Sequence, residues 1–394
     1  MDAGRKRELE EKVYAGVRLD RADGEALYAS DDLVWLGRLA HHRRTGTGDG
    51  DRVLFVVNRR LRLTGLCVGG CAYCSLRPGP DGHARPEGGD SVPLSVDEAV
   101  RRATELAADG LTELDLVDPV HPALPWRHYP ELLRALTVAL PGVRLTGFTA
   151  IELLWLGKST GMPADEILDE LVAAGLSAPS GGGAEIFDPE VRQRLGLADR
   201  AWEDWSRIHR LAHAKGIGTP ATMRFGHVEE PRHRVDHVLR LRELQDETGG
   251  FTSFLPLRYE HDLAVPTGDG IGAGQPTGTA SPAESLKTFA VSRLLLDNVP
   301  HLTCCWATQG YSVAQLALNF GVDDLAASAA GHRISHGVDR DGTPTVLPRE
   351  DLLRLIWDAD FRPAERNSGY EVLRDYDAPP SLAERRAEPQ RIWA

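Results

Sequence analysis

The chain has 394 residues, a formal net charge of −13 and a hydrophobic content of 42%. This length can bury one barrel-sized core or two ordinary domains. The acidic balance argues against a nucleic-acid groove or an anionic membrane surface as a partner, so we expect a small-molecule substrate. Five cysteines are an odd number, and Cys304 and Cys305 are adjacent, which predicts a reducing compartment and no disulfide framework. We find no signal peptide and no apolar run of about 18 residues, and we expect a cytoplasmic protein with no membrane partner.

The two ends of the chain differ in character from its middle. Residues 1–50 are predicted to form an N-terminal helical brace, because apolar residues recur at helical spacing and Ser30 is the expected N-cap of the last helix. Residues 53–58, VLFVVN, alternate poorly and are typical of a strand buried on both faces. Residues 375–394 are rich in proline and charge and are expected to be poorly packed.

Between residues 51 and 374 a pattern of strand, loop and amphipathic helix repeats. Ser95, Pro163 and Ser281 mark helix starts. The strand candidates are 61–66, 112–117, 143–148, 176–178, 217–223, 251–257, 302–306 and 324–328. Alternating β and α units imply a parallel sheet with right-handed crossovers, and eight units imply an α/β fold of the (βα)8 TIM-barrel type. A partial (βα)6 barrel with a C-terminal cap is the alternative, because the last two strands have the weakest patterns.

The most specific stretch is residues 58–82, where Cys67, Cys71 and Cys74 form C-x3-C-x2-C with Tyr73 before the last cysteine. Three thiolates can hold three irons of a four-iron cluster and leave the fourth iron open to a substrate. A zinc site is the alternative, but it would need a fourth Cys or His, and the nearest, His83, is nine residues further on.

This C-x3-C-x-aromatic-C pattern resembles the signature of the radical S-adenosylmethionine (SAM) enzymes. Segments spread through most of the chain, among them SGGGAEIFDPEVR and PLRYEHD, are similar to the aminofutalosine synthase branch of that superfamily. The resemblance implies a [4Fe-4S] cluster, SAM as cosubstrate and an external one-electron reductant such as flavodoxin or ferredoxin. It also implies a reaction of menaquinone biosynthesis, in which a 5′-deoxyadenosyl radical adds to the enolpyruvyl alkene of an aryl ether carboxylate.

The chain departs from that branch where substrate should bind. Arg60 stands where the branch has a histidine, Asp118 where it has a small or amide residue, and Gln309 within a segment that is usually Met-His-Gly. A second hypothesis is therefore a paralogue that uses the same radical on another substrate, by adenosylation or by hydrogen abstraction. A zinc-binding barrel without enzymatic activity is the third.

Barrel enzymes build their sites at the C-terminal ends of their strands, so we take the candidate residues from there. The metal candidates are Cys67, Cys71 and Cys74, and the cofactor candidates are Tyr73, Asp118, Gly183, Glu185, Arg224 and Gly226. The catalytic candidates are Arg258, His121, Gln309 and His227. Glu185 follows three glycines that allow close backbone approach, and its carboxylate can bind ribose hydroxyls. Arg258 lies on an apolar strand, where a substrate carboxylate would neutralise its charge. The two histidines could instead cap neighbouring backbone.

Overall fold

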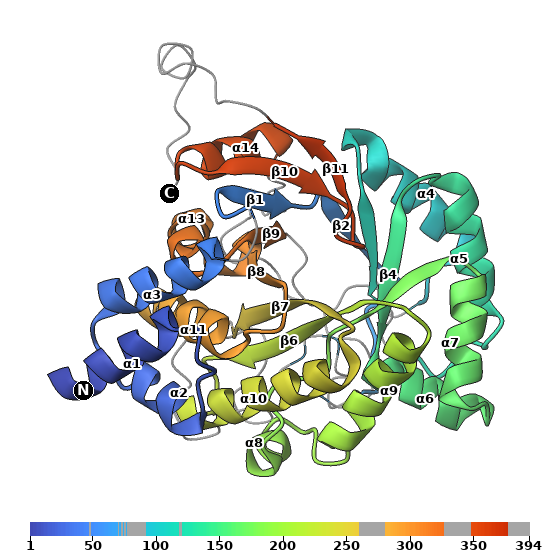
Figure 1. Cartoon of the computed structure of the whole chain (residues 1–394). Coiled ribbons are helices and arrows are strands. Elements are labelled where there is room, and N and C mark those ends of the chain that lie inside the picture. The colour runs from blue at the N-terminus through green and yellow to red at the C-terminus, as the bar shows by residue number, and fades with distance from the viewer. Residues whose placement is uncertain are drawn as a thin grey trace.

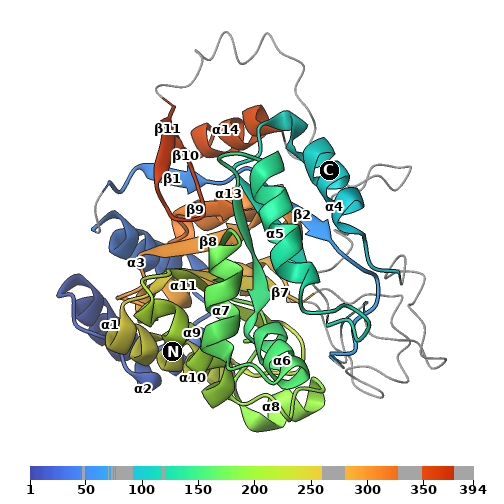
Figure 2. The same cartoon turned by 90° about the vertical axis from the view of Figure 1, so that its right-hand side faces the viewer.

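The computed structural model describes residues 1–46, 49–69, 71, 74, 76, 92–117, 120–259, 280–326 and 348–376. Within these residues, strands alternate with helices that cover the outer faces of the sheets (Figure 1), and the view turned by 90° shows α5, α6 and α7 side by side along one flank (Figure 2). The predicted α/β class is therefore confirmed. No helix among the described residues is long and apolar enough to cross a membrane.

The strands form two sheets. Their bounds are β1 (Arg52–Phe55), β2 (Asn58–Arg62), β3 (Glu113–Val117), β4 (Arg144–Thr149), β5 (Leu176–Ser180), β6 (Thr219–Phe225), β7 (Phe251–Arg258), β8 (His301–Cys305), β9 (Asp324–Ala326), β10 (Arg362–Arg366) and β11 (Val372–Asp375). One sheet has the order β2-β3-β4-β5 and the other has the order β11-β10-β1-β9-β8-β7-β6. The ladders are parallel except for the one between β10 and β11.

A short segment joins the two sheets on one side. Val56 and Val57 separate β1 from β2, and the Val56 amide donates to the Leu325 carbonyl at 3.2 Å. The Val57 carbonyl accepts from the Thr112 amide at 2.9 Å. On the other side, no ladder joins β5 to β6 among the described strands. The closed (βα)8 barrel therefore stays a prediction.

The helices are α1 (Ala3–Tyr14), α2 (Arg21–Tyr28), α3 (Leu33–Thr45), α4 (Val96–Leu106), α5 (His128–Ala139), α6 (Ala150–Thr160), α7 (Ala164–Ala173), α8 (Pro189–Arg194), α9 (Trp202–Ala214), α10 (Pro231–Thr248), α11 (Pro282–Leu295), α12 (Trp306–Gln309), α13 (Tyr311–Ala317) and α14 (Arg349–Trp357). As predicted, the Ser95 and Ser281 hydroxyls accept the first-turn amides of α4 and α11. The prediction for α3 is wrong by two residues, because the Asp32 carboxylate caps that helix while the Ser30 hydroxyl accepts from the Asp32 amide at 3.3 Å.

The eight predicted strands all overlap observed ones, but β10 and β11 were missed. Their sequences, RPAER and VLRD, lack an apolar pattern. Arg366 is nevertheless buried because it makes two bonds to Asp324, at 2.7 and 2.5 Å. Glu365 is likewise buried against Arg349, at 2.9 Å. Ion pairing replaces the hydrophobic face that periodicity detects.

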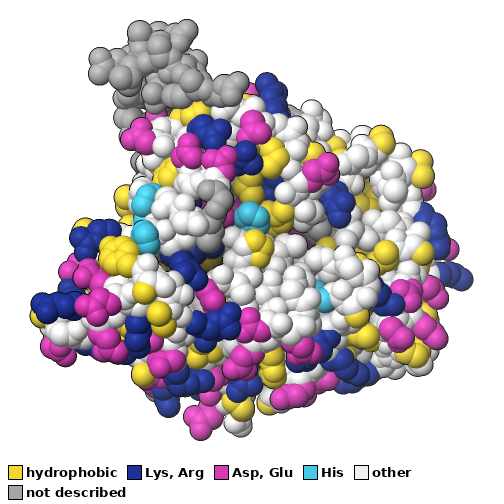
Figure 3. Space-filling view, in the orientation of Figure 1, with side chains coloured by type: hydrophobic (Ala, Val, Ile, Leu, Met, Phe, Trp, Pro, Cys, Tyr) yellow, Lys and Arg dark blue, Asp and Glu magenta, His cyan; other side chains and the backbone are white. Residues whose placement is uncertain are grey.

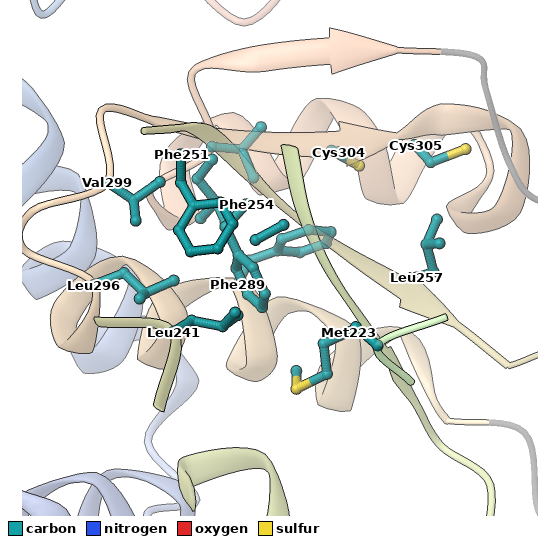
Figure 4. Packing of buried hydrophobic residues seen from close by; sticks show 14 of the residues in the cluster. Met223, Leu241, Phe251, Phe254, Leu257, Phe289, Leu296, Val299, Cys304 and Cys305 are labelled. Atoms are coloured by element: carbon teal, nitrogen blue, oxygen red, sulfur yellow. The ribbon is translucent and has the colours of Figure 1, made fainter. Parts of the chain in front are cut away.

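Apolar side chains fill the space between the sheet and its helices. Phe251 and Phe254 of β7 pack with Leu241 of α10 and Phe289 of α11 (Figure 4). Leu257, further along β7 (Figure 4), belongs to the same core and also lines the two interior cavities. The outer face of β7 therefore packs against the helices, and its inner face lines the interior cavities.

The outer surface is charged but mixed in sign. Acidic and basic side chains are interspersed over the face in Figure 3. On this face the described residues show no continuous basic patch of the kind that a nucleic acid binds.

Candidate active site at the strand ends

Cys67, Cys71 and Cys74 are free thiols that line one cavity of about 170 Å³. Residues in or directly after β2 to β7 form its walls, and they include Arg60, Leu116, Phe148, Gly182, Arg224 and Leu257. The cysteine loop thus lies at the carboxyl ends of parallel strands, where barrel enzymes place their chemistry.

Backbone hydrogen bonds hold the cysteine loop over the cavity. The Cys67 amide donates to the Leu76 carbonyl at 2.7 Å, and the Cys74 amide donates to the Cys71 carbonyl at 3.1 Å. The Gly69 amide points back at Cys67 Sγ, 3.3 Å away. A Cβ atom at Gly69 would lie 3.0 Å from the same sulfur, so this tight turn favours glycine.

The thiols need a positive charge to become thiolates. Burial raises the pKa of Cys67 to about 11 and that of Cys74 to about 12. Metal ligation requires the thiolate, and bound metal would supply the compensating charge. No group of three or more His, Cys, Asp or Glu side chains among the described residues is arranged to hold a single ion. Each cysteine of a four-iron cluster binds a different iron, so three cysteines that line one cavity fit a cluster.

Glu185 and Arg224 form another part of the wall of this cavity. Arg224 Nε donates to Glu185 Oε2 at 2.7 Å, and both side chains are buried. Glu185 has a φ of 45° and Gly183 has a φ of 84°. Phe148, in the same wall, also has a positive φ of 56°. Two non-glycine residues in a sparsely populated backbone region are typical of a functional site.

Arg60 and Asp115 form a second ion pair on the cavity wall. They are cross-strand partners on β2 and β3, and Arg60 Nε and Nη2 lie 3.0 and 2.6 Å from Asp115 Oδ2. Both residues also line a deeper cavity of about 120 Å³, whose far side includes Arg366 and Tyr370. This pair therefore stands between two polar spaces inside the fold.

Two carboxyl groups that line these two cavities have raised pKa values. Burial raises the pKa of Glu113, which lines the deeper cavity, to about 7. It also raises the pKa of Glu152, which lines the cysteine cavity, to about 7. Glu152 accepts from the Thr149 amide and so caps α6. Both groups can exchange a proton near physiological pH.

The predicted residues fall into three groups. The structure brings Cys67, Cys71, Cys74, Gly183, Glu185 and Arg224 together around one cavity. His121, His227, Gly226, Arg258 and Gln309 line neither of the two cavities described above. Tyr73 and Asp118 lie outside the described residues, as do residues 377–394 of the predicted tail.

Both histidines bond to nearby groups. His121 Nδ1 accepts from the Ala123 amide at 3.2 Å. The His227 ring lies between the Arg224 carbonyl, at 3.0 Å, and the Glu229 carboxylate, at 2.8 Å. The His121 and His227 rings thus each contact a neighbouring backbone group, and His227 also contacts a carboxylate.

The other three residues are placed by their strands. Gly226, with a φ of 86°, follows β6 and packs so closely on Ala280 that an added Cβ would lie 2.7 Å from the Ala280 Cβ. Arg258 ends β7 and is buried one residue after the cavity-lining Leu257. Gln309, in α12 after β8, is 3% exposed, and neither polar atom of its amide has a hydrogen-bond partner among the described residues.

Sequence reasoning did not select Asp115 and Arg200, which also line the cysteine cavity, and it noted Arg60 only as a departure from a family pattern. Alternation along β2 and β3 could have paired Arg60 with Asp115. Arg200 lies in a loop, between α8 and α9, where no periodicity marks it.

Comparison with known proteins decides the family. Residues 61–241 match the Radical SAM superfamily, and residues 248–378 match the CofH/MqnC C-terminal region. The chain is 54% identical over 395 residues to the aminodeoxyfutalosine synthase of Streptomyces coelicolor, covering 100% of both proteins. It belongs to the radical SAM superfamily.

Further relatives of this radical SAM enzyme have the same extent. It is 39% identical to the aminodeoxyfutalosine synthase of Thermus thermophilus, over 94% of this chain and 96% of that protein. It is 33% identical to the 5-amino-6-(D-ribitylamino)uracil–L-tyrosine 4-hydroxyphenyl transferase of Methanopyrus kandleri, over 89% and 92%. The family uses a [4Fe-4S] cluster and SAM, as the resemblance implied.

Solved structures show the same fold at low identity. HydG, a maturase of the [FeFe]-hydrogenase, has a TM-score of 0.68 at 14% identity, over 94% of this chain and 77% of HydG. Methylornithine synthase (PylB) has a TM-score of 0.68 at 16% identity, over 90% of this chain and 97% of PylB.

Proposed function

We propose that this radical SAM enzyme adds the 5′-deoxyadenosyl group of SAM to the enolpyruvyl-type alkene of an aryl ether carboxylate, in the futalosine route to menaquinone. The observation that carries the proposal is the 54% identity to an aminodeoxyfutalosine synthase over the full length of both chains. An external one-electron reductant such as flavodoxin or ferredoxin would supply the electron.

The proposed cofactor site is the cysteine cavity. Cys67, Cys71 and Cys74 would hold the cluster, which when reduced supplies the electron that cleaves SAM. Glu185 would accept hydrogen bonds from the SAM ribose, and Arg224 fixes the direction of its carboxylate. Gly183 allows the loop to pack closely on Ile151, since a Cβ there would lie 2.8 Å from Ile151 Cδ1. Tyr73, Asp118 and Gly226 complete the proposed site.

The proposed substrate residues approach from the neighbouring strand ends. Gln309 has a buried amide whose unmade hydrogen bonds a substrate would satisfy. Arg258 ends the adjacent strand β7 and would neutralise a substrate carboxylate. Arg60, on the wall between the two cavities, is a second cation for the same purpose. His121 and His227 complete the proposed substrate set.

We also propose that the two sheets close into a (βα)8 barrel. The segment between β1 and β2 already joins them on one side. Across the other side, the Thr222 hydroxyl donates to the Gly181 carbonyl at 2.7 Å, and the Arg224 amide donates to the Glu185 carbonyl at 3.0 Å. These bonds support closure between β5 and β6.

One observation favours a second candidate, a paralogue with another radical acceptor. Arg60 and Gln309 depart from the family pattern, and Arg60 lines both cavities. The 33% identical relative is named as a transferase that acts on L-tyrosine, so this scaffold serves more than one acceptor.

Product analysis tests the proposal. The enzyme is reconstituted anaerobically with iron and sulfide and given SAM labelled in the adenosyl carbons, together with the aryl enolpyruvyl ether. We expect labelled adenosyl carbon bonded to substrate, and none with the Cys71→Ala variant. Release of 5′-deoxyadenosine without any adduct would favour hydrogen abstraction by a paralogue.

A further inference from the structure

Arg200 reaches the cysteine loop from a remote part of the chain. It lies between α8 and α9, 129 residues from Cys71 and 131 from Gly69. Its Nη1 donates to Cys71 Sγ at 3.4 Å, and its Nη2 donates to the Gly69 carbonyl. The side chain is 17% exposed and lines the cysteine cavity.

Arg200 differs from the other arginines in this cavity in how its positive charge is compensated. Arg60 is paired with the buried Asp115, and Arg224 with the buried Glu185. The carboxylate near Arg200 is that of Asp199, which is 3.7 Å from Nε and 75% exposed. An exposed carboxylate screened by water compensates a charge only weakly.

We propose that Arg200 is a positioning residue that fixes the cysteine loop and makes the cluster easier to reduce. The inference rests on the proposed cluster at Cys67, Cys71 and Cys74. A guanidinium is permanently charged, and its planar fork bonds two acceptors at once, here a sulfur and a carbonyl. Hydrogen bonds to the sulfurs and the net charge nearby set the reduction potential of an iron–sulfur cluster. A cation at Cys71 Sγ stabilises the more negative, reduced state.

Two variants separate the effect of the positive charge of Arg200 from the effect of its planar, two-donor guanidinium. Arg200→Met removes both, while Arg200→Lys keeps the charge and loses the planar geometry. Arg207→Gln is the matched control, because Arg207 lies on α9, is 58% exposed and pairs with Asp204, at 3.4 Å. Each protein is reconstituted anaerobically without SAM. Iron and sulfide per chain are measured, and the midpoint potential is determined by a redox titration followed by EPR.

We expect Arg200→Met to lower the midpoint potential of the cluster by about 59 mV. For a one-electron couple this is about a tenfold fall in the ratio of reduced to oxidised cluster. Arg200→Lys should keep most of the potential and bind less iron, because its single ammonium cannot hold both contacts. Arg207→Gln should match the parent protein. Thermal unfolding of the cluster-free variants checks that they fold; if Arg200→Met does not, the iron content and potential of Arg200→Lys decide.

The outcomes distinguish this inference from the proposed function. If Arg200→Met had the iron content and midpoint potential of the parent protein, Arg200 would not act on the cluster, and the proposed function would stand. SAM affinity is then measured by calorimetry on the reconstituted proteins. A loss of that affinity at unchanged potential would make Arg200 a SAM ligand and would also overturn the inference. A parent protein that takes up no cluster would overturn both.

Discussion

Glu185 and Arg224 are joined by two hydrogen bonds, one between their side chains at 2.7 Å and one between their backbones at 3.0 Å. Glu185 has a positive φ and lies two residues after the last glycine of the run that follows β5, whereas Arg224 is part of β6. These two hydrogen bonds therefore hold the loop after β5 against the next strand, β6. They also aim one carboxylate into the cysteine cavity.

Arg224→Met leaves the Glu185 carboxylate buried without its ion-pair partner. Breaking a buried pair by removing one member costs about 3–5 kcal/mol of the free energy of unfolding. We expect a loss in this range by urea denaturation, and weaker SAM binding by calorimetry. Glu185→Gln should weaken SAM binding with a smaller stability loss, since the amide oxygen still accepts from Arg224. Arg207→Met, on an exposed helix face, is the control. A stability equal to the control would show that the pair does not hold the loop.

Cys67→Ala, Cys71→Ala and Cys74→Ala should each abolish SAM cleavage, because each thiolate would anchor a different iron. Cys304→Ala and Cys305→Ala should retain it, since both thiols are buried at the end of β8 and do not line the cysteine cavity. Iron content, EPR and 5′-deoxyadenosine formation after anaerobic reconstitution measure the difference. Full cluster content in any loop variant would refute the assignment.

Glu113 should make stability depend on pH. Burial raises its folded-state pKa to about 7, so the folded protein holds this proton more tightly than the unfolded chain does. The resulting stability is complete below the unfolded pKa of about 4.3 and is lost as the pH rises through about 7. At about 1.4 kcal/mol per pKa unit, the loss is at most about 4 kcal/mol.

Glu113→Gln removes this titration, so its free energy of unfolding should fall less than that of the parent protein between pH 5 and pH 8. Urea denaturation at both pH values measures the change. Glu203→Gln, at an exposed position on α9, should follow the parent. If Glu113→Gln followed it as well, the proton would not reside on Glu113.

The sequence predicted the part of the fold that rests on local patterns. Helix caps such as Ser95 and Ser281 and the parallel strands follow from side chains close in sequence. Strand β10 was missed because its buried Arg366 depends on Asp324, 42 residues away. A contact over that distance leaves no local pattern.

The same division holds at the candidate site. Cysteine spacing and the glycine run before Glu185 are local signals, and the structure brings these residues to one cavity. Arg200 has no such signal, because it acts through a contact across 129 residues. For Arg258, strand periodicity located the end of β7 but did not reveal that the preceding Leu257 lines the cavity.

Gln309 offers a test of the substrate site. Its side chain is 3% exposed, and both polar atoms of its amide lack partners in the part of the chain that the structure describes. A buried polar group without a hydrogen bond costs about 1–3 kcal/mol. A residue that keeps this cost in the free protein is explained if a ligand supplies the missing partners.

Gln309→Met therefore should keep or raise the free energy of unfolding, because it replaces an unsatisfied amide by an apolar chain of similar size. It should weaken substrate binding by about 5- to 30-fold, which is about 1–2 kcal/mol. SAM affinity and iron content should not change. Gln315→Met is the matched control on α13, since Gln315 Nε2 donates to the Leu355 carbonyl at 3.0 Å. That variant should lose stability and bind substrate normally. If Gln309→Met instead lost stability like Gln315→Met and bound the substrate unchanged, Gln309 would be a structural residue.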